Sequence, residues 1–273
     1  MKRFAPWMLQ APALALVTVL LIVPVIGVLI VTAGSGRMVA IFQGFLSSGF
    51  NQAVIWRTLQ VALLTTVLAL PIGFAAAYVV ARAPGRAKSL LLIAAVFPLL
   101  TGVVVRSFAF MVLLGRNGVI NNLLLKFGIV DEPLSLLYSQ PAVIIGLVYL
   151  FTPLMILSLV GVLEGIDESI LQASASLGAT PAATFRQVIL PLAAPGLIVG
   201  SVLVFSGSFT AFATPQLLGG DRQMVLATLL YQKAMVDFDW IGASTIATIM
   251  MAITFSTIFV MSSLARRLNP TAV

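Results

Sequence analysis

Six long stretches with almost no charged residues constrain this chain more than any other feature. A helix needs about 20 apolar residues to cross the hydrocarbon core of a bilayer. Only 8% of the residues are charged and 60% are hydrophobic, whereas a soluble domain carries roughly 25% charged residues. The sequence therefore predicts an all-α membrane protein with six transmembrane helices in one domain, 1–273. The spans cover approximately 12–33, 57–81, 89–114, 139–163, 194–218 and 241–265.

The first stretch allows a second interpretation. Lys2 and Arg3 give a charged start, and Val31-Thr32-Ala33 could serve as the cleavage site of a signal peptide. The apolar run is about 20 residues long, however, and exceeds the 7–15 residues of a signal-peptide core. We therefore expect this stretch to be kept as a span.

The basic residues predict the orientation of the spans. An even number of spans places both termini on one side, and cytoplasmic flanks carry an excess of Lys and Arg. With the termini inside, eight basic residues lie in cytoplasmic segments and six in external ones. The cytoplasmic set is Lys2, Arg3, Arg82, Arg86, Lys88, Arg186, Arg266 and Arg267. We expect both termini in the cytoplasm.

Several classes of function are excluded by what the chain lacks. It contains no cysteine and no histidine, so thiol catalysis, zinc fingers, disulfides and histidine relays are impossible within it. No lysine follows a glycine, so there is no phosphate-binding P-loop. The scattered basic residues do not indicate nucleic-acid binding. We expect no catalytic residues, no metal and no cofactor bound by this chain.

A polar segment of about 27 residues, 164–190, separates the fourth and fifth spans. Asp167 is placed to cap a first short helix, and Gly178 is placed to end it with a positive φ. Thr180 and Pro181 then fit the N-cap and first position of a second helix. The segment is either an amphipathic connector at the membrane surface or a hairpin on which another protein docks.

The spacing within this hairpin resembles the EAA loop of type I ABC-importer permeases. That loop reads Glu-Ala-Ala, three residues, Gly, nine residues, an Ile-like residue, one residue and Leu-Pro. The chain has Gln172-Ala173-Ser174, then Gly178, Val188 and Leu190-Pro191 at the same spacing. It departs from the family pattern where Gln172 replaces the glutamate and Ser174 replaces an alanine. Residues 105–115 and 239–243 also resemble spermidine/putrescine-type permeases.

The resemblance implies a permease subunit of a bacterial inner-membrane importer. Its expected partners are a second permease, two cytoplasmic ATPases that hold ATP and Mg²⁺, an external solute-binding protein and membrane lipid. The solute implied is a polyamine or a related compound. The coupling residues carried over from the family loop are Glu164, Gln172, Ala173, Ser174, Gly178, Ala179, Thr180 and Pro181. The alternative is an ATP-independent channel or secondary carrier.

The spans contain few groups that could hold a solute. Arg106 is the one charge well inside a span; it either lines the path or makes a structural contact, for example with backbone carbonyls. Aromatic faces could bind ammonium groups, and the candidates are Phe108, Phe110, Tyr149 and Phe151. Carboxylates could come from a second permease or from the outer loops, at Asp131, Glu132, Asp221, Asp237 and Asp239.

Overall fold

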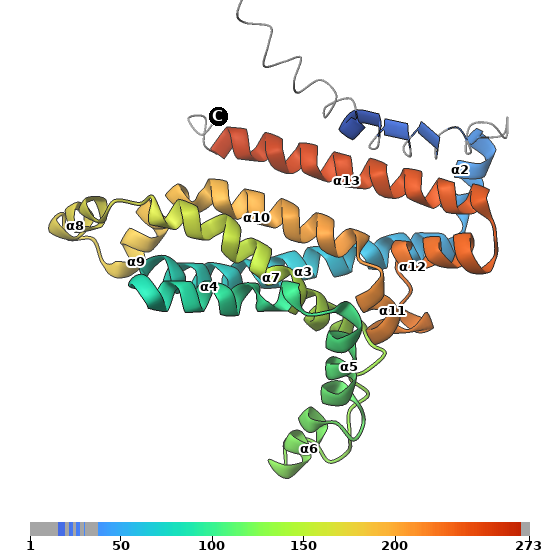
Figure 1. Ribbon diagram of the computed structural model, residues 1–273, viewed down its shortest axis with the longest axis horizontal. Helices are drawn as coiled ribbons and strands as arrows, with labels where there is room; N and C mark the ends of the chain where they lie inside the picture. Colours follow the sequence, from blue (N-terminus) through green and yellow to red (C-terminus); the bar gives the residue numbers. More distant parts are fainter. Residues whose placement is uncertain (1–15, 20–21, 24–25, 28–29, 31–37, 269–273) are drawn as a thin grey trace, which may run out of the picture. The chain divides into compact units, whose positions relative to one another are not determined.

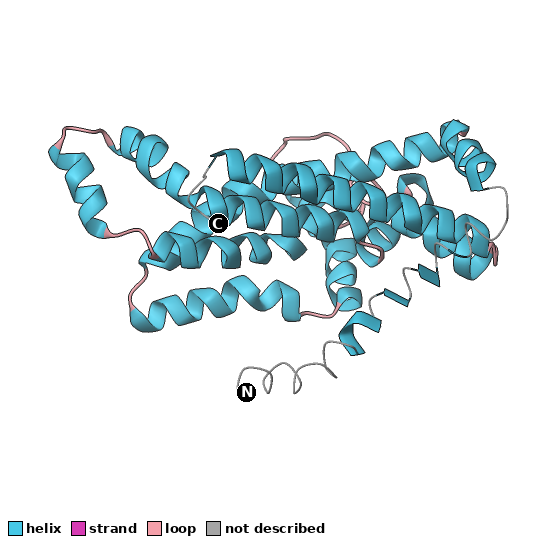
Figure 2. Ribbon diagram, turned by 90° about the horizontal axis from the view of Figure 1, so that it is seen from above, coloured by secondary structure: helices cyan, strands magenta, loops and turns pink. Residues whose placement is uncertain are grey.

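The computed structural model describes residues 16–19, 22–23, 26–27, 30 and 38–268, with side chains up to residue 263. Every regular element in these ranges is helical (Figure 2), which confirms the all-α prediction. Most of the predicted first span, 12–33, and the candidate cleavage site at 31–33 lie outside the described residues.

Long helices alternate with short ones along the described part of the chain. The α-helices are α2 (Met38–Ser47), α3 (Gly49–Arg82), α4 (Gly85–Leu100), α5 (Val103–Leu114), α6 (Val119–Lys126), α7 (Gln140–Glu164), α8 (Glu168–Ser176), α9 (Pro181–Thr184), α10 (Leu190–Thr210), α11 (Ala213–Gly219), α12 (Leu226–Tyr231) and α13 (Trp240–Leu268). Short π-helical or 3₁₀ turns are η1 (Phe185–Ile189), η2 (Asp221–Gln223) and η3 (Gln232–Val236).

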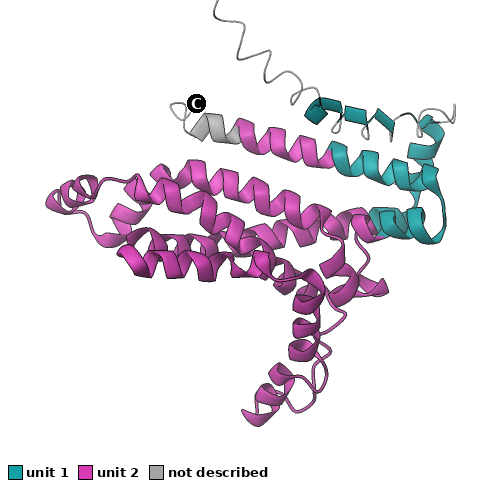
Figure 3. Ribbon diagram, in the orientation of Figure 1, with its two compact units in different colours: residues 1–53, 229–252 teal, residues 54–228, 253–273 magenta. Residues whose placement is uncertain are grey.

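The chain divides into two compact units (Figure 3). One comprises residues 1–53 and 229–252, and the other comprises 54–228 and 253–273. The larger unit contains the predicted hairpin and all five predicted path residues. Within it, α8 and α9 lie at one end of the helical bundle, and α5, α6 and α11 lie at the other (Figure 1).

Helix α7 forms the centre of the larger unit, and both α3 and α10 pack closely against it: a Cβ atom built on Gly73 of α3 would lie 2.5 Å from the Met155 side chain. Met155 and Leu159 of α7 are fully buried. A Cβ atom built on Gly200 of α10 would lie 2.4 Å from Ser158 Oγ, and one on Gly196 would lie 2.8 Å from the Ser158 carbonyl oxygen. The Ser158 hydroxyl donates to the Gly196 carbonyl at 3.1 Å. Glycines four residues apart allow this close approach, as in other membrane helix pairs.

Five helical stretches in the described part of the chain are long and apolar enough to cross a membrane. They are Gly49–Arg82, Val103–Lys126, Gln140–Glu164, Pro181–Thr210 and Trp240–Ser263, and the apolar helix Met38–Ser47 is shorter. The stretch Val103–Lys126 contains a turn between α5 and α6. These helices fit the predicted membrane protein, and the first predicted span lies mostly outside the described residues.

Two predicted spans differ from the observed helices. The stretch 89–114 is not one helix, because Thr101 and Gly102 have extended backbone angles and separate α4 from α5. The fifth span begins earlier than 194, since η1 continues directly into α10, and it ends at Thr210. Ala211 is extended there, with ψ of 128°, and α11 starts a new helix.

Candidate functional site: the hairpin and an aromatic cavity

The hairpin between α7 and α10 is built from locally capped helices. The Asp167 carboxylate accepts a hydrogen bond from the Ser169 amide at 2.8 Å and so caps α8. Hydrogen bonds from Ser169 lower the pKa of the Asp167 carboxyl. Thr180 caps α9 through the Ala183 amide at 3.3 Å, and Pro181 occupies the first turn. Both predicted starts are therefore confirmed.

Gly178 ends α8 in the left-handed conformation, with φ of +79°, as the sequence predicts. Its amide donates to the Ala175 carbonyl at 2.9 Å, and the Ala179 amide donates to the Ser174 carbonyl at 3.1 Å. This pair of bonds is a Schellman motif, which satisfies carbonyls that a helix end leaves free. The turn direction of the hairpin therefore depends on a residue without a side chain.

A side-chain bond ties the two arms of the hairpin together. The hydroxyl oxygens of Ser174 on α8 and Thr184 on α9 lie 2.9 Å apart. Ser174 is half-buried, so it faces the second arm rather than free solvent. Thr184 was not among the predicted site residues, because its partner lies ten positions away across a turn.

An apolar stripe on α8 remains exposed. Ile170, Ala173 and Leu177 recur at helical spacing, and Leu177 is 89% exposed while Ile170 is 43% exposed. Gln172 is also exposed. Apolar residues at this spacing normally face a packed interior. On α8, no other described part of the chain covers them.

Glu164 makes an ion pair at the base of the hairpin. It is the last residue of α7, and its carboxylate lies 2.8 Å from Lys88 Nζ at the start of α4. Both side chains are about one third exposed. The pair connects α7 to α4 where the hairpin begins, and Lys88 is a site neighbour that sequence spacing could not identify.

Two of the predicted path aromatics meet beside a cavity. The rings of Phe110 on α5 and Tyr149 on α7 are 5.5 Å apart and nearly perpendicular. Both line a cavity of about 540 Å³ among α3, α4, α5 and α7, whose other walls include Pro98 and Thr152. Its surface is apolar except for a few hydroxyl groups, so aromatic faces are its main means of attracting a cation.

Arg106 lies in the first turn of α5 and is only 5% exposed. Its Nη1 donates to the Pro98 carbonyl at 2.8 Å, and the Thr101 hydroxyl donates to the same oxygen at 2.9 Å. Pro98 lies in the last turn of α4, where carbonyls have no helical partner. Arg106 thus bridges the break between α4 and α5. Its Nη2 has no hydrogen-bond partner among the described residues.

The remaining predicted path residues are not part of this cluster. Phe108 is exposed on α5. Phe151 packs against α10, where a Cβ atom on Gly207 would lie 2.5 Å from its ring. The structure therefore brings together Phe110 and Tyr149 but places Phe108 and Phe151 elsewhere.

In the smaller unit, two of the predicted outer acids are paired. Lys233 Nζ lies 3.1 Å from Asp237 and 3.6 Å from Asp239. The hydrogen bond to Asp237 raises the pKa of the Lys233 ammonium, with Asp239 adding to the effect. Asp239 also accepts from the Gly242 amide at the start of α13. These carboxylates are therefore partly neutralised within the chain.

The sequence comparison places this architecture in a known group. Residues 69–271 match the family described as "binding-protein-dependent transport system inner membrane component". The chain belongs to this family of ABC-importer permeases, and it is a multi-pass inner-membrane transport component. The alternative of an ATP-independent channel or carrier is not supported.

The chain is also similar to individual proteins of known name or structure. The chain is 34% identical over 203 residues to the spermidine/putrescine transport system permease protein PotB of Haemophilus influenzae, covering 73% of this chain and 71% of that protein. It is 32% identical to PotB of Escherichia coli, covering 72% of each. A bacterial alginate ABC transporter, solved in complex with its alginate-bound periplasmic protein, matches over all of both chains with TM-score 0.80 and 17% identity. That last likeness shows the fold alone.

Proposed function

We propose that this chain forms, with a second permease subunit, the translocation path of an ATP-driven importer for a polyamine or a related small solute. An external solute-binding protein delivers the solute, and two cytoplasmic ATPases hold ATP and Mg²⁺. The PotB relatives belong to spermidine/putrescine transport systems, which supports this substrate class. The chain itself catalyses no reaction in this proposal.

The hairpin is the proposed coupling element. The observation that carries this role is a hairpin with an uncovered apolar stripe: the Ser174–Thr184 bond and the Gly178 turn join its two arms, and Leu177 remains exposed. An element that transmits force must keep its shape and must seat against its partner. A contiguous apolar patch on the surface outside the membrane is the kind of feature that marks a contact with another protein. The proposed contact surface comprises Gln172, Ala173, Ala179, Thr180 and Pro181 together with Leu177 and Ile170.

Glu164 has a different part in the proposal. Its pairing with Lys88 favours a positioning role at the base of the hairpin over direct contact with an ATPase. A partly exposed ion pair of this kind contributes at most about 1 kcal/mol. In this proposal the Lys88–Glu164 pair transmits movement of the hairpin to α4. The other end of α4 contacts Arg106 and lines the aromatic cavity.

The cavity lined by Phe110 and Tyr149 is the proposed part of the solute path. Two ring faces can hold an ammonium group with about 0.5–2 kcal/mol each. Such weak sites suit a path from which the solute must leave. The carboxylates that a polyamine would also need are proposed to come from the second permease.

This proposal also fixes the orientation. Since the hairpin must meet cytoplasmic ATPases, α8 and α9 lie inside, and both termini are expected in the cytoplasm. Reporter fusions after Arg37 and after Arg86 should report opposite sides of the membrane. An external location for Arg86 would contradict the orientation.

The whole proposal is tested by reconstituting the chain with its second permease, ATPases and binding protein in proteoliposomes. Spermidine-loaded binding protein should stimulate ATP hydrolysis and spermidine uptake. Gly178→Asp should abolish both responses while the spans still insert, because it places a side chain at positive φ and a charge at the joint. Gly161→Ala controls for an added side chain alone, since a Cβ atom there meets nothing within 4 Å, as at Gly178, but Gly161 is not at positive φ. Uptake that continues without ATP would refute the proposal.

A further inference from the structure

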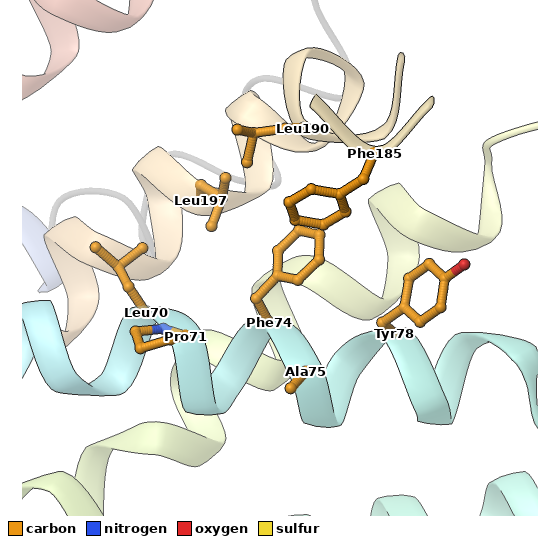
Figure 4. Close-up of a pocket in the computed structure, with 8 residues that line it drawn as sticks. All are labelled: Leu70, Pro71, Phe74, Ala75, Tyr78, Phe185, Leu190 and Leu197. Carbon is orange, nitrogen blue, oxygen red and sulfur yellow. The ribbon is translucent and has the colours of Figure 1, made fainter. Parts of the chain in front are cut away.

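A second cavity, separate from the proposed path, lies between α3 and α10. It measures about 610 Å³. Its α3 wall consists of Leu70, Pro71, Phe74, Ala75 and Tyr78 (Figure 4). These residues recur at helical spacing, so they form one strip about 12 Å long at 1.5 Å per residue.

The opposite wall comes from the end of the hairpin and from α10. Leu190 and Leu197 line it from α10. Phe185 of η1 completes the wall and packs edge-on against Phe74, with ring centroids 5.4 Å apart (Figure 4). Apart from the Tyr78 hydroxyl, the side chains around this groove are apolar. We call it the α3–α10 groove.

The positively charged side chain of Arg82 lies at one end of the α3–α10 groove. The Arg82 guanidinium stacks over the Tyr78 ring at 4.7 Å, one turn beyond the groove in the last turn of α3. Arg82 is exposed, and it takes part in none of the ion pairs found among the described residues. The groove therefore combines an apolar channel along the span with an uncompensated positive charge at the end of the span.

The lining of the groove indicates which occupant suits it. It is apolar for about 12 Å along the span and carries a positive charge at one end only. An extended hydrocarbon chain that ends in an anionic headgroup matches both features. Phosphate is the anion that an arginine at the edge of a bilayer meets most readily.

We propose that the α3–α10 groove binds an acyl chain of an anionic phospholipid, with Arg82 pairing its phosphate headgroup. Because Phe185 belongs to η1, directly after the hairpin arm α9, the bound chain would touch the segment that joins the hairpin to α10. The lipid would then be a structural ligand at the joint between the hairpin and the membrane. This inference does not depend on the identity of the transported solute.

The test places a diazirine-bearing amino acid at position 197, inside the groove, in the full chain reconstituted in nanodiscs. The discs contain equal amounts of phosphatidylglycerol and phosphatidylcholine. Mass spectrometry after illumination should show phosphatidylglycerol enriched among the adducts at 197. The same amino acid at position 199, an exposed residue of α10, should label both lipids equally.

Arg82→Gln should lower the phosphatidylglycerol enrichment about two- to fivefold, the effect of losing one exposed ion pair. Arg86→Gln, which removes an exposed arginine four residues away, should leave it unchanged. Equal labelling by the two lipids at 197, or an unchanged enrichment in Arg82→Gln, would overturn the proposal. So would adducts at 197 to a polypeptide when the complete transporter is illuminated.

Discussion

Ser174 and Thr184 face each other across the hairpin, with their hydroxyl oxygens 2.9 Å apart. The bond joins α8 to α9 on either side of the Gly178 turn. It explains how a serine can stand where the family loop has an alanine: the hydroxyl is used inside the hairpin. The hairpin is thus closed both by a backbone motif and by a side-chain bond.

Removing this bond should loosen the hairpin without unfolding it. Thr184→Val deletes the hydroxyl and keeps the shape, at a cost of about 0.5–1.5 kcal/mol. Hydrogen exchange at the Ala179 amide, which bonds to the Ser174 carbonyl, should accelerate about two- to tenfold. Thr184→Ser keeps a hydroxyl and should exchange like the native chain. Equal protection in both variants would show that the bond does not hold the arms.

The contact between α7 and α10 should be sensitive to a single methyl group. Gly200→Ala would place a Cβ atom 2.4 Å from both Met155 Sδ and Ser158 Oγ. Overpacking of this kind costs about 1–3 kcal/mol, so the melting temperature of the purified protein should fall. Gly161→Ala adds the same group to α7, where it meets nothing within 4 Å. The interpretation fails if the two variants melt alike.

Arg106 is expected to act through structure rather than through the solute. Arg106→Ala removes the bond to the Pro98 carbonyl at the break between α4 and α5, and a hydrogen bond from a charged group contributes about 1.5–3 kcal/mol. The amount of assembled transporter should fall, while the surviving complexes keep their apparent solute affinity. Quantitative immunoblotting alongside uptake kinetics separates these effects. Strong loss of uptake at normal assembly would place Arg106 in the path instead.

The cap of α8 should depend on pH in acid. The pKa of Asp167 is lowered in the folded protein by the hydrogen bonds from Ser169. Its stabilisation is therefore fully present above the ordinary value of about 3.9 and is lost as the pH falls through the folded-state pKa. Exchange at the Ser169 amide, taken relative to Asp167→Asn, should rise below that range. Asparagine caps a helix without titrating, so a constant ratio would contradict this account.

Helix-capping patterns in the sequence predicted the turns of the hairpin correctly. They did not predict contacts between residues that are distant in the sequence. Asp167, Thr180 and Gly178 act within four residues of their own position, so capping chemistry identified them correctly. The pairs Lys88–Glu164 and Ser174–Thr184 join residues that sequence spacing does not relate. The break at Thr101–Gly102 was missed because hydropathy is continuous across it.

The predicted path residues illustrate what sequence alone leaves open. Phe110 and Tyr149 were selected as aromatic residues in neighbouring spans, and their contact depends on how α5 packs against α7. Phe108 is two residues from Phe110 and lies on another side of the same helix, since residues two apart do not share a face. Composition identified the candidates, and only the packing separated them.

The most direct test of the central claim is a cross-link between the hairpin and an ATPase. The native chain has no cysteine, so Leu177→Cys gives a single reactive group in place of the most exposed large apolar side chain of the hairpin. In membranes that contain the assembled transporter, it should cross-link to single-cysteine variants of the ATPase, with a yield that changes when ATP is added. Phe127→Cys changes a residue that is also well exposed, at the C-cap of α6, the helix at the opposite end of the unit, and should give no such product. If Leu177→Cys reaches no ATPase position while transport remains intact, the hairpin is only a connector.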